Sequence, residues 1–307
     1  MFLALLLKVL PLYLMIAIGY VAGRFANISD RQIADFIIHF IAPFVLLAMA
    51  WQAEIDPGVS FAFIMLLAVL TLFMAGASYF YGDMIWGDKR KNLFSNQILG
   101  ANTGYFGIPV AFALFAADTA NLWILAIITS TIIHNSVGYY ILARGNLSPW
   151  DGFQKLLRLP LFWSMILGLA LSIFRVPWID GLNDTMDMFK GAYFVLGMAI
   201  IGLSMARLQL KHFDLNYIWN TLLWRFPVWT LVTAGLIYLD QTFFGLLTPE
   251  YYGLMFLYAL MPLPANSVAY AAQLDVHPQR AAAAVLASTL VAIGYIPLMM
   301  SIYTQLN

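Results

Sequence analysis

The feature that most constrains this chain is a succession of apolar stretches, each about as long as a membrane is thick. Crossing the ~30 Å hydrocarbon core takes roughly 20 apolar residues in a helix. The 307 residues are 63% hydrophobic and only 10% charged, whereas soluble domains carry about 25% charged residues. We therefore expect an all-α membrane protein with ten transmembrane helices, at about 2–23, 32–51, 60–86, 93–116, 121–143, 159–176, 188–206, 219–239, 251–273 and 281–303.

Lysine and arginine are distributed unequally over the loops between these spans. The odd-numbered loops hold eleven of them: Arg24, Arg31, Lys89, Arg90, Lys91, Arg144, Lys155, Arg158, Arg207, Lys211 and Arg280. The even-numbered loops hold only Arg175 and Lys190. Because cytoplasmic loops are enriched in these residues, we expect a multi-pass protein of the cell (inner or plasma) membrane with both termini outside. Lys8 and Arg225 fall within spans, and we expect both long side chains to reach the membrane interface.

Two of the spans are interrupted by residues that break helices. The fourth contains Asn102-Thr103-Gly104 and Gly107-Ile108-Pro109, and the ninth contains Pro262, Pro264 and Asn266. Non-helical backbone at membrane depth is tolerated only where it is buried in protein or lines a cavity. Interrupted spans in corresponding positions of two halves are the best sequence indication of a transporter binding site.

Short similarities between the two halves indicate an internal repeat. Residues 10–13 (LPLY) resemble residues 159–162 (LPLF), and Ser130-Thr131 resembles Ser288-Thr289. The broken fourth span corresponds to the broken ninth in the same order. Because each half has five spans, an odd number, we expect the two repeats to be inverted relative to each other.

At these residues the chain resembles the auxin efflux carrier family, which includes plant auxin exporters and bacterial permeases for malate, malonate and similar acids. The resemblance covers essentially the whole chain, and its most specific segments are 102–109 (NTGYFGIP), 264–267 (PANS) and 287–290 (ASTL). It implies two inverted five-helix repeats, with broken helices 4 and 9 crossing at mid-membrane at Pro109 and either Pro262 or Pro264.

The resemblance also implies a division into two domains and a homodimer. The scaffold domain would comprise residues 1–58 and 159–210, and the moving transport domain residues 59–158 and 211–307. The central loop, residues 144–158, is short compared with the regulatory loop of the long plant exporters. This difference favours a permease of the prokaryotic kind.

The two breaks predict a site for an anion. The second half of each broken span starts at the break, so two helix N-termini, each equivalent to about +0.5 charge, face the membrane centre. Candidate substrate-binding residues are Asn102, Thr103, Gly104, Pro109, Pro262, Pro264, Asn266 and Ser267 at the breaks, with His134 and Asn135 from the fifth span. The opposing C-terminal ends supply carbonyl groups that could instead hold a cation.

Each of these residues also has a purely structural interpretation. Glycine and proline are ordinary in membrane helices, and the polar side chains could hydrogen-bond between helices. Asp83 and His134 are candidates for carrying a coupled proton, because ionisable groups in a membrane are costly and need a reason. Asp83 could equally be a solvated carboxylate at a helix end, near Lys89–Lys91.

The expected function is a secondary transporter of a small organic anion, a carboxylate, working by alternating access. A sodium-coupled symporter of the bile-acid type is the nearest alternative, but both breaks lack Asp and Glu; a channel or receptor is more remote. Walker, HExxH and GxSxG motifs are absent, so we expect no direct use of ATP and no enzymatic activity. We expect no cofactor, no metal and no nucleic-acid partner, but membrane lipids and a second copy of the chain as partners.

Overall fold

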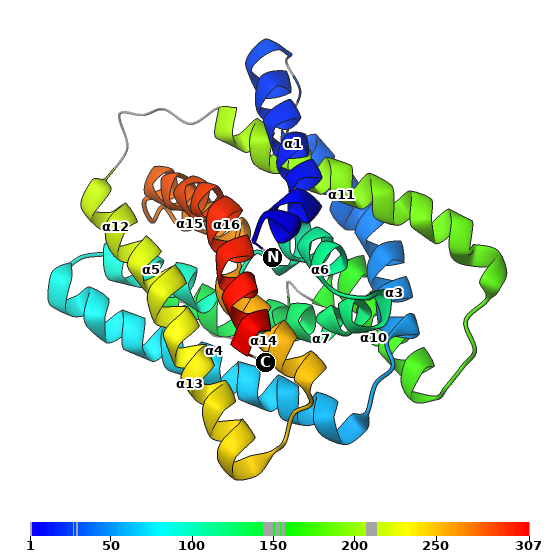
Figure 1. Cartoon of the computed structure of the whole chain (residues 1–307). Coiled ribbons are helices and arrows are strands. Elements are labelled where there is room, and N and C mark those ends of the chain that lie inside the picture. The colour runs from blue at the N-terminus through cyan, green and yellow to red at the C-terminus, as the bar shows by residue number, and fades with distance from the viewer. Residues whose placement is uncertain are drawn as a thin grey trace.

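The computed structural model describes residues 2–26, 28, 30–143, 150, 154, 157–206 and 214–306. In this part of the chain all regular structure is helical, and no strand occurs. The α-helices, with the π-helical or 3-10 turns labelled η, are α1 (Phe2–Phe25), α2 (Asp30–Phe36), η1 (Ile37–Ile41), α3 (Ala42–Gln52), α4 (Pro57–Ile85), α5 (Arg90–Leu99), η2 (Thr103–Gly107), α6 (Ile108–Leu114), α7 (Ala117–Ile133), η3 (His134–Gly138), α8 (Tyr139–Leu142), α10 (Pro160–Ile173), η4 (Asp180–Leu182), α11 (Asn183–Ala206), α12 (Leu215–Leu223), η6 (Trp224–Val228), α13 (Trp229–Leu239), η7 (Asp240–Phe244), α14 (Pro249–Leu260), α15 (Asn266–Gln273) and α16 (Pro278–Leu306) (Figure 1).

Seven helices are long and apolar enough to cross a membrane, and each coincides with an expected span. They are Phe2–Phe25, Gln32–Gln52, Pro57–Ile85, Ala117–Leu142, Asp180–Ala206, Leu215–Phe244 and Pro278–Gln305. A shorter apolar helix, α10, occupies the expected sixth span. The expected fourth and ninth spans are helices broken into α5 and η2–α6, and into α14 and α15. The chain is an all-helical, multi-pass membrane protein.

The long helices turn large apolar side chains outward and polar ones inward. On α4, Val69 and Phe80 are 64% and 72% exposed, whereas Thr71 and Ser78 are buried. Leu231 on α13 is 72% exposed, while Thr230 beside it is buried. Such a surface is unfavourable in water but suits lipid, where polar groups are costly unless they face the protein interior.

Close helix packing in one part of the molecule depends on glycines. A Cβ on Gly19 of α1 would stand 2.1 Å from the Ala199 carbonyl oxygen of α11, and a Cβ on Gly202 of α11 would stand 2.0 Å from the Ile16 carbonyl oxygen. Helices in lipid associate by such close backbone approach, which only small residues permit. Figure 1 shows α1, α3, α10 and α11 on one side of the molecule and α5, α12 and α13 on the other.

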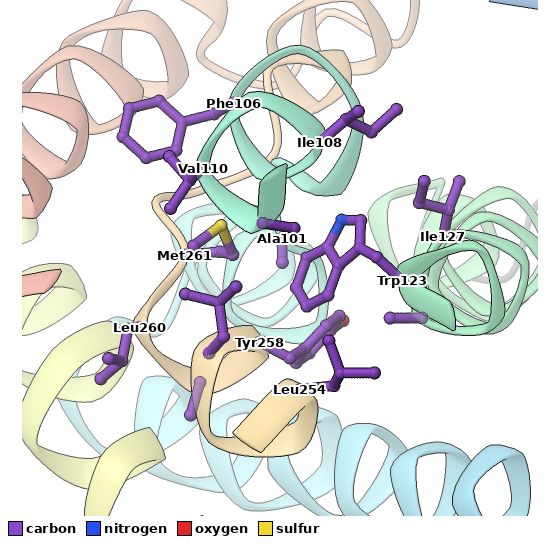
Figure 2. Close-up of a cluster of buried hydrophobic side chains, with 14 of the residues drawn as sticks. Ala101, Phe106, Ile108, Val110, Trp123, Ile127, Leu254, Tyr258, Leu260 and Met261 are labelled. Carbon is purple, nitrogen blue, oxygen red and sulfur yellow. The ribbon is translucent and has the colours of Figure 1, made fainter. Parts of the chain in front are cut away.

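The two broken helices lie in the interior, within an apolar cluster (Figure 2). Phe106 and Val110 follow the first break, Tyr258 precedes the second, and Trp123 comes from α7; all four are fully buried. Ala101 and Met261, one from each break, lie in the middle of this cluster. The apolar packing fixes the position of both breaks and leaves their polar backbone groups to be satisfied by specific partners.

Candidate functional site

The two breaks contact each other directly. The first comprises Gly100 to Asn102 and the second Met261 to Ala265. The Asn102 backbone N–H donates to the Pro262 carbonyl oxygen at 2.9 Å. A Cβ on Gly100 would stand 2.6 Å from the Pro264 Cγ, so only glycine allows the two segments to approach this closely. Residues about 160 positions apart in the sequence therefore form one structural unit.

Side chains from neighbouring elements satisfy the backbone on both sides of the first break. The Asn102 side-chain oxygen accepts a hydrogen bond from the Phe106 N–H at 3.4 Å and so caps the start of η2. Trp123 Nε1 donates to the Thr103 carbonyl at 2.9 Å, and Trp229 Nε1 donates to the Ile98 carbonyl at 2.8 Å. The cap uses only the oxygen of the Asn102 amide, so its Nδ2 group remains available as a donor.

A cavity of about 280 Å³ opens at this crossing. Seven of the predicted site residues line it: Asn102, Thr103, Gly104, His134, Asn135, Pro264 and Asn266. The other lining residues include Ile38 of η1 and Tyr193 of α11, with further side chains from α3 and α10. Among the residues that the structure describes, none that lines the cavity is Asp, Glu, Lys or Arg. The sequence thus placed most of the polar site residues around one cavity, although their predicted role in binding stays a prediction.

Two of the buried polar atoms without a partner among the described residues belong to residues that line this cavity. His134 is buried, and its Nε2 atom has no hydrogen-bond partner in the part of the chain that the structure describes. The same holds for the hydroxyl of Tyr105, whose side chain also borders the cavity. Unsatisfied buried polar atoms are uncommon in native proteins and indicate a missing water, ion or ligand. His134 therefore fits the prediction that it lines a binding site.

Asn135 reaches the same cavity but is already engaged with the protein. Its Nδ2 donates to the Thr131 carbonyl at 2.7 Å, and its Oδ1 accepts from the Tyr270 hydroxyl. The Tyr270 ring lies against His134, with the ring centroids 5.5 Å apart. Asn135 and Tyr270 thus orient the wall that carries His134. Tyrosines had not been predicted here, because in membrane helices tyrosine more often marks the interface than a site.

Three of the predicted residues at the breaks do not line the cavity. Ser267 is buried, donates to the Pro264 carbonyl at 2.7 Å and accepts from Gln97 Nε2 at 3.1 Å. Pro262 contributes its carbonyl to the contact with Asn102. The expectation that Pro109 marks the crossing is wrong, because this proline lies within the first turn of α6, where a missing N–H costs no hydrogen bond, and the break comes seven or more residues earlier.

Two predicted roles for charged residues change with the structure. Asp83 is exposed at the end of α4, pairs with Lys91 and does not border the cavity, in agreement with the solvated alternative. The expectation that Arg225 reaches the membrane interface is wrong, because its side chain is 0% exposed and lies beside the crossing. Lys8, by contrast, is exposed.

No protein-family model matches the chain, and no curated protein matches it.

Proposed function

We propose that this chain is a secondary transporter of a small organic anion, a carboxylate, which works by alternating access. The observation that supports this most is the cavity at the crossing of the two broken helices. Its described lining residues include neutral hydrogen-bond donors and no Asp, Glu, Lys or Arg. A carboxylate needs donors and positive potential, and a carrier must release it again. Neutral donors supply binding without the tight hold of a lysine or arginine.

The electrostatics of the crossing favour an anion. The helices that begin at Thr103 and Asn266 both start beside the cavity, and each N-terminus carries the equivalent of about +0.5 charge. The Asn102 amide adds a donor at the same place, and His134 adds another in the tautomer that carries its proton on the unpaired Nε2. The volume, about 280 Å³, lies just below the ~300–1,000 Å³ range of ligand pockets and suits a small substrate.

The same proposal includes the full ten-span topology. Seven long helices, α10 and the two broken helices would give ten spans, arranged as two inverted repeats of five. In this arrangement the glycine-packed pairs, α1 with α11 and α3 with α10, form the scaffold, and the crossing belongs to the domain that moves. The cavity lies between the two, since residues of α3 and α11 line it together with residues of the breaks.

Saturable counterflow tests the proposal and separates a carrier from a channel. Purified protein in liposomes preloaded with unlabelled malate or malonate should accumulate external labelled substrate transiently, whereas a channel gives no such overshoot. A preceding thermal-shift screen of mono- and dicarboxylates selects the substrate, because a bound ligand raises the melting temperature by mass action. The proposal fails if no small organic anion shifts the melting temperature or shows counterflow.

Asparagine variants locate the site. Asn102→Ala and Asn266→Ala should each weaken binding by roughly 1–3 kcal/mol, the usual cost of removing a hydrogen bond to a charged group, or about 5- to 140-fold in Kd. Asn92→Ala is the matched control, because Asn92 is buried and donates to the Ile141 carbonyl at 2.9 Å but lies away from the cavity. Equal affinity in all three variants would show that the substrate binds elsewhere.

A further inference from the structure

Arg225 is a fully buried cation that contacts both breaks. It lies in the π-helical turn η6, two residues before Pro227. Its Nε donates to the Met261 carbonyl at 2.6 Å, its Nη2 to the Tyr258 carbonyl at 2.7 Å, and its Nη1 to the Gly100 carbonyl at 3.1 Å. The guanidinium thus bridges the end of α5 and the end of α14, two segments that are far apart in the sequence.

The acceptors of these bonds lie where α5 and α14 end. The Gly100 and Met261 carbonyls follow the last turn of each helix, and the Tyr258 carbonyl also accepts from the Met261 N–H at 3.2 Å. The last four carbonyls of an α-helix have no partner within it, and each C-terminus is equivalent to about −0.5 charge. Two such ends meet at Arg225, so together they provide about one negative charge opposite one guanidinium. The Trp229 ring lies below the guanidinium at 4.9 Å from its centroid and adds a cation–π contact.

No carboxylate is needed to explain this burial. Arg225 takes part in no ion pair among the residues that the structure describes. A buried cation is costly unless it is paired and hydrogen-bonded, and here three carbonyl groups and an aromatic face provide the pairing. The planar fork of arginine reaches acceptors on two helix ends at once, which a lysine ammonium on a single stem does not match.

We infer that Arg225 provides, as a permanent part of the protein, the positive charge that binds the carbonyl groups at the crossing. In transporters with broken helices, unwound carbonyls and half-helix C-termini hold a coupling ion such as sodium. In this chain the guanidinium occupies that carbonyl cluster, and its charge excludes a second cation, so the crossing is held together without a bound metal ion. For the proposed carrier, sodium bound at this place then provides no driving force; this last consequence rests on the proposed function, whereas the role of Arg225 does not.

Chemical rescue tests the inference in substrate-free protein in detergent. Arg225→Ala should lower the melting temperature by at least about 5 °C, because it removes three hydrogen bonds and leaves the Gly100 and Met261 carbonyls buried without the guanidinium. About 10 mM guanidinium chloride should restore half or more of that loss, whereas sodium and potassium chloride at equal ionic strength should restore less. Arg280→Ala is the matched control: it removes an arginine that pairs with Asp214 at 3.2 Å on a partly exposed surface, and guanidinium should not rescue it.

Two further measurements remain decisive if Arg225→Ala does not fold. Arg225→Lys keeps the charge and should fold with an intermediate melting temperature. Wild-type protein should melt at the same temperature in sodium and in potassium. A melting temperature that rises with sodium over potassium in wild type, or equal guanidinium responses of Arg225→Ala and Arg280→Ala, would overturn the inference. If guanidinium rescues Arg225→Ala but the wild-type protein takes up no organic anion, the role of Arg225 is supported and only the proposed function is refuted.

Discussion

Gly202 provides the sharpest test of how the helices pack. A Cβ added there would stand 2.0 Å from the Ile16 carbonyl oxygen and 2.5 Å from the Tyr20 nitrogen, both backbone atoms of α1, whereas real Cβ contacts are essentially never shorter than 3.0 Å. Gly202→Ala therefore forces α1 and α11 apart by about 1 Å. Overpacking of this kind costs roughly 1–3 kcal/mol, and the better helix propensity of alanine returns about 1 kcal/mol. We expect a net loss of up to about 2 kcal/mol.

Gly191, on the same helix, is the matched control with the opposite sign. A Cβ there meets nothing within 4 Å, so Gly191→Ala should stabilise the protein by about 0.5–1 kcal/mol. At roughly 2–4 °C per kcal/mol, Gly202→Ala should melt about 1–12 °C below Gly191→Ala in calorimetry of the detergent-solubilised protein. If Gly202→Ala melts at or above the temperature of Gly191→Ala, the close approach of α1 and α11 is wrong.

Three other predictions test the site, the topology and a buried carboxylate. His134→Phe should weaken anion binding about 5- to 140-fold in titration calorimetry. It should change the stability of the ligand-free protein by no more than about 1 kcal/mol, because the Nε2 atom has no partner in the described part of the protein. A loss of stability without a loss of affinity would show that the role of His134 is structural. A cysteine at Gly87, in a chain with no cysteine of its own, should react with an impermeant maleimide only after the cells are opened; labelling of intact cells would reverse the proposed orientation. Asp240→Ala should lower stability by roughly 2–3 kcal/mol in thermal melts, because it removes the acceptor of the Tyr252 hydroxyl and of two backbone amides. The control Asp187→Ala, at an exposed carboxylate, should change stability by no more than about 0.5 kcal/mol. Equal effects of the two substitutions would show that the buried hydrogen bonds contribute little.

Much of the helix arrangement follows from patterns that are local in the sequence. Runs of about 20 apolar residues place the long helices, and the positions of Asn, Gly and Pro place both interruptions close to where the structure has them. The exact break was harder to predict. Pro109 looked like the breaking residue, but proline is compatible with the first turn of a helix, and the close approach of Gly100 to Pro264 cannot be read from either segment alone.

The roles of polar residues depend on partners that are distant in the sequence. Ser267 and Asn102 are both small polar residues at a helix break, so the sequence gives no reason to treat them differently. In the structure Ser267 is hydrogen-bonded to Gln97, whereas Asn102 lines the cavity. Arg225 was expected to extend to the interface because it lies near the end of its span. Its actual partners are carbonyl groups on two other helices, and no one-dimensional pattern records where unpaired carbonyls converge.

The hydrogen bonds across the crossing also determine when the fold can be completed during synthesis. The Asn102 N–H has its partner at Pro262, so the acceptor is made 160 residues later (262 − 102). At about 5–20 residues per second, this interval is roughly 8–32 s. Arg225 and Trp229, which serve the carbonyls of Gly100 and Ile98, are made somewhat earlier. Until then the first broken helix enters the membrane with its interruption unpaired, so a nascent chain that stalls before Pro262 remains dependent on the insertion machinery or becomes a target for degradation.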